Sequence, residues 1–134
     1  MKKLMKRKNN KGFSLVELIV VVLIMGIIAV ALAPQVMKWV GTSKEQTDES
    51  NKAALKSSVQ VALADWQIDN AIPASGSDQT YTVSAGTLSG SDATGWTGLK
   101  DKIDEVTAGD YPEPQAVTSF TITIYGGSGK VEVN

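Results

Sequence analysis

The sequence predicts an α+β protein in which one long N-terminal α-helix packs on a small antiparallel β-sheet head. Two patterns support this fold class. An apolar run over residues 13–33 passes into an amphipathic helical pattern, and apolar residues alternate with polar ones near residue 120. The first half of the helix is therefore expected to be apolar and the second half amphipathic. With 134 residues, the chain has room for one ordinary domain and little more.

Charge is distributed unevenly along the chain. The formal net charge is −1, yet six of the 13 basic residues lie within residues 2–11, and the remaining body is strongly acidic. An acidic body repels phosphate groups, so no direct nucleic-acid partner is expected. The chain contains no His and no Cys, which removes the commonest general base, thiol chemistry and most zinc sites. We therefore expect neither an enzyme nor a cofactor or metal site.

The apolar run predicts a helix that crosses a membrane. Of the 21 residues from 13 to 33, 18 are apolar. A helix of that length rises about 31 Å, and the hydrocarbon core of a bilayer is about 30 Å thick. Because the basic residues precede the run, the N-terminal tip is expected to stay in the cytoplasm and residues after about 37 to lie outside.

A cleaved secretory signal is an alternative interpretation of the same run. Such signals have an apolar region of about 7–15 residues that ends at small residues. This run is longer and carries Glu17 near its start. Pro34 would obstruct cleavage after Ala31-Leu32-Ala33, which leaves Ala29-Val30-Ala31 as the alternative site. A retained anchor is the favoured interpretation.

A glycine, an aromatic residue and a carboxylate stand at the head of the apolar run, in the order Lys11-Gly12-Phe13-Ser14-Leu15-Val16-Glu17. A charge inside a membrane segment is costly and requires a partner. The simplest interpretation places Glu17 among solvated lipid headgroups. The junction, however, closely resembles the class III signal of type IV prepilins. The absence of Cys fits a pilin of the Gram-positive type better than the disulfide-closed pilins of many Gram-negative bacteria.

The resemblance implies specific roles for four residues. A prepilin peptidase would cut between Gly12 and Phe13, and Phe13 would become the methylated N-terminus. Glu17 would pair with the Phe13 ammonium of a neighbouring subunit and set the axial register of a filament. Gly26 and Pro34 also match the family pattern, in which this stretch can bend or unwind; the alternative is an ordinary kinked membrane helix.

Beyond Pro34 the pattern becomes amphipathic. Leu55, Val59, Ala62 and Trp66 share one helical face, widened by Leu63, and predict a single helix from Phe13 to Asp69 that Pro73 ends. Pro34 and Gly41 are the places where this helix can bend. A charged surface with an Asp48–Lys52 ion pair is expected to be solvated, and it comprises Lys44, Glu45, Asp48, Glu49, Lys52 and Lys56.

The rest of the head is predicted to be irregular chain with a few short elements. A strand is expected over residues 80–84, a helix over 97–107, and a closing β-hairpin over 117–125 and 130–133. Asp78 and Asp92 are interpreted as turn residues rather than calcium ligands. The expected core of the head contains Leu55, Val59, Trp66, Ile122 and Ile124.

Together these features predict a leader over residues 1–12, a membrane and filament-core helix over 13–40 and an extracellular head over 41–134. The resemblance implies a structural subunit of a type IV pilus, of use in adhesion or motility. Its partners would be the membrane, prepilin peptidase, the pilus assembly platform and identical subunits in a helical homopolymer. A pseudopilin of a type II secretion or DNA-uptake system is the alternative, and a single-pass anchored binding module is a third hypothesis.

Overall fold

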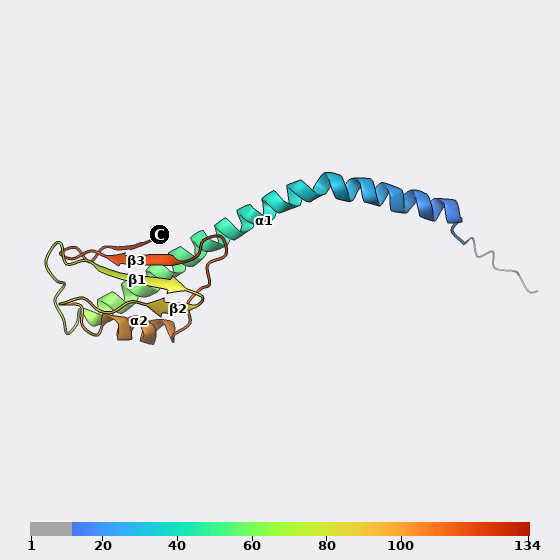
Figure 1. The fold of residues 1–134 in the computed structure, drawn as a ribbon. Coiled ribbons are helices and arrows are strands. Elements are labelled where there is room, and N and C mark those ends of the chain that lie inside the picture. Colours follow the sequence, from blue (N-terminus) through green and yellow to red (C-terminus); the bar gives the residue numbers. More distant parts are fainter. Residues whose placement is uncertain (1–11) are drawn as a thin grey trace, which may run out of the picture. The chain divides into compact units, whose positions relative to one another are not determined.

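The computed structural model describes residues 12–134, so the predicted leader lies outside the described residues apart from Gly12. The chain divides into two compact units, one ending at Trp39 and one covering Val40–Asn134. The elements, shown in Figure 1, are α1 (Leu15–Trp66), β1 (Gln79–Ser84), β2 (Thr87–Ser89), α2 (Leu99–Thr107), β3 (Phe120–Ile124) and β4 (Val131–Val133).

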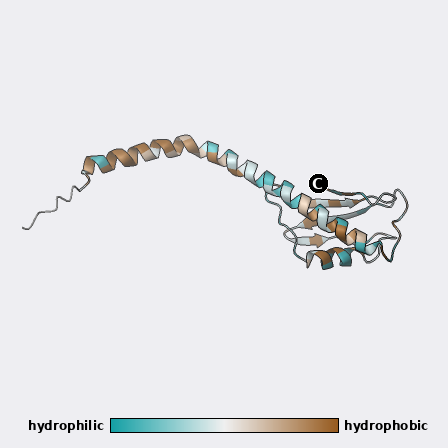
Figure 2. Cartoon of the chain, turned by 180° about the vertical axis from the view of Figure 1, so that it is seen from behind, coloured by the Kyte–Doolittle hydropathy of each residue, from teal (hydrophilic) through white to brown (hydrophobic). Residues whose placement is uncertain are grey.

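Helix α1 is 52 residues long and contains Pro34. Hydropathy changes along it: the first half is almost uniformly apolar and the second half is mixed (Figure 2). The helix is slightly shorter than the predicted range of 13–69. It starts later because Ser14 accepts the first helical hydrogen bond, from Leu18 N–H at 3.1 Å. It ends earlier because the Asn70 side-chain amide donates to the Trp66 carbonyl at 2.9 Å, which satisfies the last turn.

Four antiparallel strands form one sheet in the order β2-β1-β3-β4. Strand β1 pairs with β3, with Tyr81 opposite Ile122, and β3 pairs with β4, with Ile124 opposite Val131. The closing hairpin predicted from the alternating pattern is present as β3–β4. Val117, which the pattern placed in the hairpin, lies outside β3 and is 47% exposed. The long helix on a small antiparallel sheet confirms the predicted fold class.

Strand β2 was not expected from the sequence. It is three residues long, and Leu88 is its one buried side chain. Ala85 and Gly86, with φ of 49° and 70°, join it to β1 as a two-residue turn between the paired residues Ser84 and Thr87. Positive φ at both central positions is the geometry that matches the twist of a tight hairpin. Ala-Gly is a weak signal for this turn, because alanine rarely adopts positive φ.

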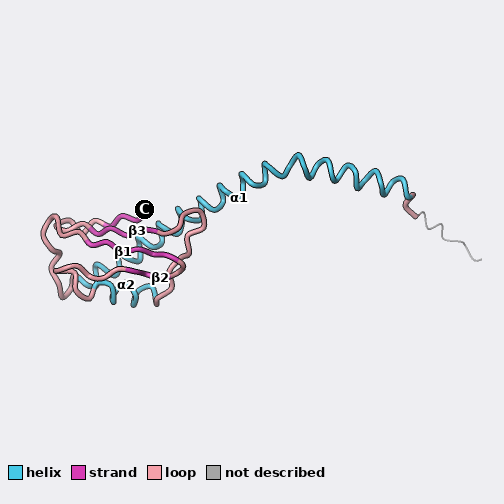
Figure 3. Tube along the Cα trace, in the orientation of Figure 1, coloured by secondary structure: helices cyan, strands magenta, loops and turns pink. Residues whose placement is uncertain are grey.

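Long loops connect β2 to α2 and α2 to β3 (Figure 3). Helix α2 lies within the predicted range of 97–107 and begins at Leu99, after Gly98 in the left-handed region at φ 81°. Leu99 and Ile103 are fully buried, whereas Val106, which shares their helical spacing, is 39% exposed.

One apolar core joins the second half of α1, α2 and one face of the sheet. Trp66 stacks on Trp96 with ring centroids 5.6 Å apart, and its indole N–H donates to the Thr97 carbonyl at 3.0 Å. The five residues expected in the core are each at most 3% exposed: Leu55, Val59, Trp66, Ile122 and Ile124. The helix therefore supplies one wall of the head's core.

We expect the fragment Gly41–Asn134 to fold as a monomer and to depend on Trp66. Trp66→Ala should lower the free energy of unfolding by about 3–5 kcal/mol, because a buried, stacked indole is replaced by a cavity. Urea unfolding followed by circular dichroism measures the change. Ile68→Ala is the matched control, since Ile68 is on the following turn and 77% exposed; it should change stability by less than about 0.5 kcal/mol. Equal effects of the two substitutions would contradict the helix-on-sheet core.

Candidate functional site

The junction before α1 is an open segment of chain. Gly12, Phe13 and Ser14 have no regular secondary structure, and Phe13 is 86% exposed. A Cβ added at Gly12 would meet no atom within 4 Å. The peptide bond between Gly12 and Phe13 is therefore accessible to an enzyme that closes around the backbone.

Glu17 has a local partner that the sequence analysis missed. The Ser14 backbone N–H donates to Glu17 Oε2 at 3.1 Å, while Ser14 itself starts the helix. A serine followed three residues later by a glutamate is the spacing of a capping box, and this contact is the glutamate half of it. The Ser14-x-x-Glu17 spacing was the signal available in the sequence. The bond holds the carboxylate at the N-terminal end of α1, one residue from the Phe13 nitrogen.

Nothing within residues 12–134 covers the apolar side chains of the first half of α1. Every large apolar side chain from Phe13 to Val40 is between 46% and 86% exposed. This part of the helix is long and apolar enough to cross a membrane. Gly26 lies in open surroundings, with nothing within 4 Å of an added Cβ. Pro34 lies inside the helix, where it lacks the N–H that would bond the Val30 carbonyl. Bending or unwinding at these two residues stays a prediction.

The prediction that Asp48 belongs to a solvated surface on the second half of α1 is wrong. It is 3% exposed, and it accepts backbone N–H groups from three consecutive residues 67 or more positions away. The distances are 2.7 Å to Gln115, 2.7 Å to Ala116 and 3.2 Å to Val117. The predicted Asp48–Lys52 pair is replaced by Lys52 with Glu49 at 3.1 Å. Asp48 therefore ties the loop before β3 to α1.

The environment of Asp48 favours its charged form. Burial opposes ionisation of the carboxyl, but the three backbone N–H bonds and the nearby Lys52 ammonium outweigh it, so the pKa of Asp48 lies below its ordinary value. The carboxylate is thus the state that holds the loop near neutral pH.

Asp78 and Asp92, in the Ser/Gly-rich loops, also accept hydrogen bonds from backbone N–H groups. Asp92 accepts the Gly98 N–H at 2.7 Å and the Lys100 N–H at 3.1 Å, and so caps the start of α2 from the loop that precedes it. It also accepts the Tyr81 hydroxyl at 2.5 Å. Asp78 accepts the Gly126 N–H at 2.9 Å. Within residues 12–134, no group of three or more acidic residues lies close enough to hold a metal ion.

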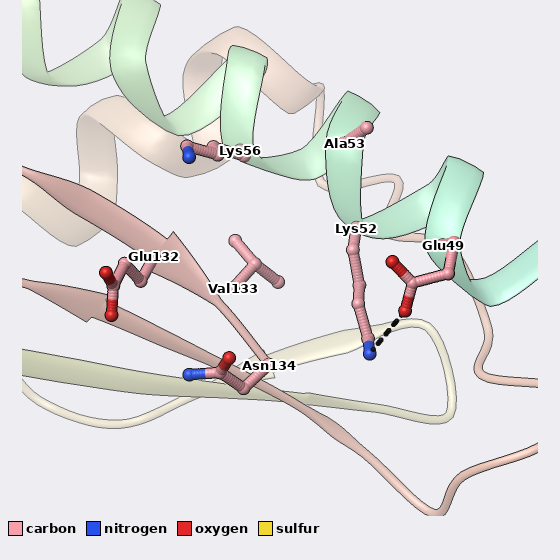
Figure 4. A pocket seen from close by; sticks show the side chains of 7 residues that line it. All are labelled: Glu49, Lys52, Ala53, Lys56, Glu132, Val133 and Asn134. Carbon is pink, nitrogen blue, oxygen red and sulfur yellow. Dashed lines mark hydrogen bonds and ion pairs between the residues drawn. The ribbon is translucent and has the colours of Figure 1, made fainter.

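A shallow groove of about 340 Å³ lies between α1 and β4 (Figure 4). Three of its four charged side chains have partners: Lys52 pairs with Glu49, and Glu132 pairs with Lys130 at 2.5 Å and accepts the Tyr125 hydroxyl at 2.9 Å. The groove is lined by Glu49, Lys52, Ala53, Lys56, Glu132, Val133 and Asn134. Most of the charge in this open groove is therefore balanced by pairs within the chain.

Comparisons with known proteins agree with the features of the junction. The prokaryotic N-terminal methylation motif matches residues 7–33. Prepilin peptidase-dependent protein A of Clostridium perfringens is 35% identical over 125 residues, which cover 91% of this chain and 83% of that protein. No solved structure matches the chain significantly. An apolar helix of membrane-spanning length on an α+β head defines the class, and the chain belongs to the family of type IV pilin-like proteins.

We expect Asp48→Asn to loosen the loop before β3 without unfolding the sheet. The amide lacks the negative charge and one acceptor oxygen, so the N–H groups of residues 115–117 should exchange with solvent on the order of tenfold faster. Hydrogen exchange of the full chain in detergent, resolved by residue, measures this. Glu49→Gln is the control, because Glu49 is exposed and accepts no loop N–H. Unchanged exchange in Asp48→Asn would refute the tie.

The contribution of Asp48 to the free energy of unfolding should depend on pH, and the same variant measures it. The pKa of Asp48 is lowered in the folded protein, so its contribution to stability is present above the ordinary carboxyl range and is lost as pH falls through the lowered pKa. The difference in unfolding free energy between the native chain and Asp48→Asn should therefore shrink below about pH 4.

Proposed function

We propose that this chain is a structural subunit of a type IV pilus filament and has no catalytic role. The observation that carries the proposal is the exposed Gly12–Phe13 bond directly before a capped apolar helix, within the matched methylation motif. A relative whose name marks it as prepilin peptidase-dependent supports the same processing here.

Processing changes the chemistry of the helix end. Hydrolysis by prepilin peptidase converts the Phe13 amide nitrogen into an α-amine, which carries a positive charge at neutral pH and is then methylated. Removal of residues 1–12 also removes six positive charges from the cytoplasmic side. The mature helix would thus begin with one positive charge, on the Phe13 nitrogen. The surface near it is apolar apart from one carboxylate, Glu17.

Assembly would supply the cover that α1 lacks within its own chain. Before assembly, the lipid of the cytoplasmic membrane surrounds residues 13–40, with the N-terminal tip inside. The assembly platform then moves the subunit into a homopolymer on the cell surface, where neighbouring helices replace the lipid. A buried ammonium without a countercharge is strongly unfavourable, so the Phe13 ammonium would lie against Glu17 of an adjacent subunit and set the axial register.

Two alternatives share some of these features. A pseudopilin of a type II secretion or DNA-uptake system would use the same junction and the same helix. An anchored binding module that never polymerises would keep Lys2–Lys11 in the mature protein. Filament imaging separates the first alternative from a pilin, and the mass of the intact mature chain tests the second.

We expect the mature protein to begin at Phe13 with a methylated α-amine. Mass spectrometry of the N-terminal peptide from surface-sheared material measures this. Gly12→Val should block cleavage, because a branched side chain then occupies the open position beside the scissile bond. Ser14→Ala is the matched control: it changes the junction but leaves Gly12 and Phe13 intact. Normal maturation of Gly12→Val would remove the peptidase assignment.

Two substitutions of Glu17 separate its charge from its capping contact. Glu17→Gln keeps an oxygen that accepts the Ser14 N–H, whereas Glu17→Ala loses both the contact and the charge. Both variants should insert and be processed, and both should form far fewer filaments, because the Phe13 ammonium then lacks its countercharge. Electron microscopy of sheared fractions, with an immunoblot of the membrane pool, measures this. Abundant filaments from processed Glu17→Gln would show that capping, not charge, is the role of Glu17.

A further inference from the structure

One of the three tryptophans has an environment unlike the other two. Trp66 and Trp96 are at most 3% exposed and donate their indole N–H groups to backbone carbonyls. Trp39 is 62% exposed, and within residues 12–134 its indole N–H has no hydrogen-bond acceptor. A large amphipathic ring without a partner in its own chain points to a partner outside it.

The position of Trp39 along α1 indicates what that partner is. The uncharged stretch from Leu18 to Met37 rises about 30 Å, which matches the roughly 30 Å hydrocarbon thickness of a bilayer. Glu17 precedes this stretch directly, Lys38 follows it, and Trp39 lies two residues, about 3 Å, beyond its end. When Glu17 lies at one edge of the hydrocarbon layer, Trp39 therefore reaches the headgroup region at the other edge.

We propose that Trp39 is the residue that anchors the unassembled subunit in the headgroup region of the outer leaflet. Tryptophan is enriched at this depth because its ring is apolar and its N–H binds water or lipid oxygens. The partner is thus the glycerol and headgroup layer of phospholipids. This inference rests on the membrane-inserted state in the proposed function and adds the residue that sets its depth. Together, Trp39 and Glu17 would hold the Gly12–Phe13 bond at the opposite surface.

Fluorescence quenching by brominated lipids tests the proposal. The full chain is reconstituted into vesicles of phosphatidylcholine and phosphatidylglycerol that carry bromine near the headgroup, at mid-chain or near the methyl end. Subtracting the emission of Trp39→Phe isolates Trp39 from the two buried tryptophans. The control is the double variant Trp39→Phe with Val36→Trp, which moves the indole three residues, about 4.5 Å, toward the bilayer centre. Val36 is 47% exposed, so an indole fits there.

The expected result is the largest loss of Trp39 emission with bromine nearest the headgroup, and a shift of that maximum toward mid-chain bromine in the control. Equal quenching at all depths, or a maximum at mid-chain for Trp39 itself, would overturn the anchor. A chain that floats with the vesicles while Trp39 stays unquenched would also overturn it but leave membrane insertion intact. A chain that does not float with the vesicles would overturn the anchor and the membrane-inserted state of the proposed function together.

Discussion

An apolar helix that its own chain cannot cover is the constraint on which the other features depend. Each large side chain from Phe13 to Val40 needs an apolar partner outside the molecule. Lipid can provide one, and in the proposed filament the helices of other copies would provide another. A charge has few tolerable positions on such an apolar surface, so Glu17 and the nitrogen that the proposed cleavage would free at Phe13 become the two groups that need a partner. The same helix must also end in a head that is stable in water, so its composition changes near Val40.

Carboxylates that accept backbone N–H groups hold the loops of the head in place. Its loops are long, and no disulfide closes them because the chain has no Cys. Asp48 holds the loop before β3, Asp92 holds the start of α2, and Asp78 holds the turn before β4. Each carboxylate satisfies N–H groups in loops or in the first turn of α2, which would otherwise need water. The acidic composition of the body thus includes structural residues as well as solvated ones.

The periodic parts of the fold could be predicted from the sequence, whereas long-range polar contacts could not. The buried stripe of α1 and the β3–β4 hairpin follow from spacing alone. Asp48 lies four residues from Lys52 and so looked like half of a surface pair; its partners are a loop distant in sequence. Strand β2 is too short to show an alternation of apolar and polar residues, and the Ala-Gly turn before it is a weak hairpin signal. At the junction, the resemblance indicated Gly12, Phe13 and Glu17, whereas the capping bond of Glu17 was missed although the Ser14-x-x-Glu17 spacing signals it.

The continuity of α1 has a mechanical consequence for a subunit in a filament. The helix that would be gripped by neighbouring subunits is the helix that forms a wall of the head's core. A pull along its axis is carried by successive turns of one helix, each closed by its own backbone bonds. The strands receive that load through side-chain packing on Leu55, Val59 and Trp66 and through the bonds of Asp48 to the loop before β3, and their ladders are not in series with it. In the proposed filament, such an arrangement would let a thin fibre bear tension while the hydrogen bonds between its strands stay intact.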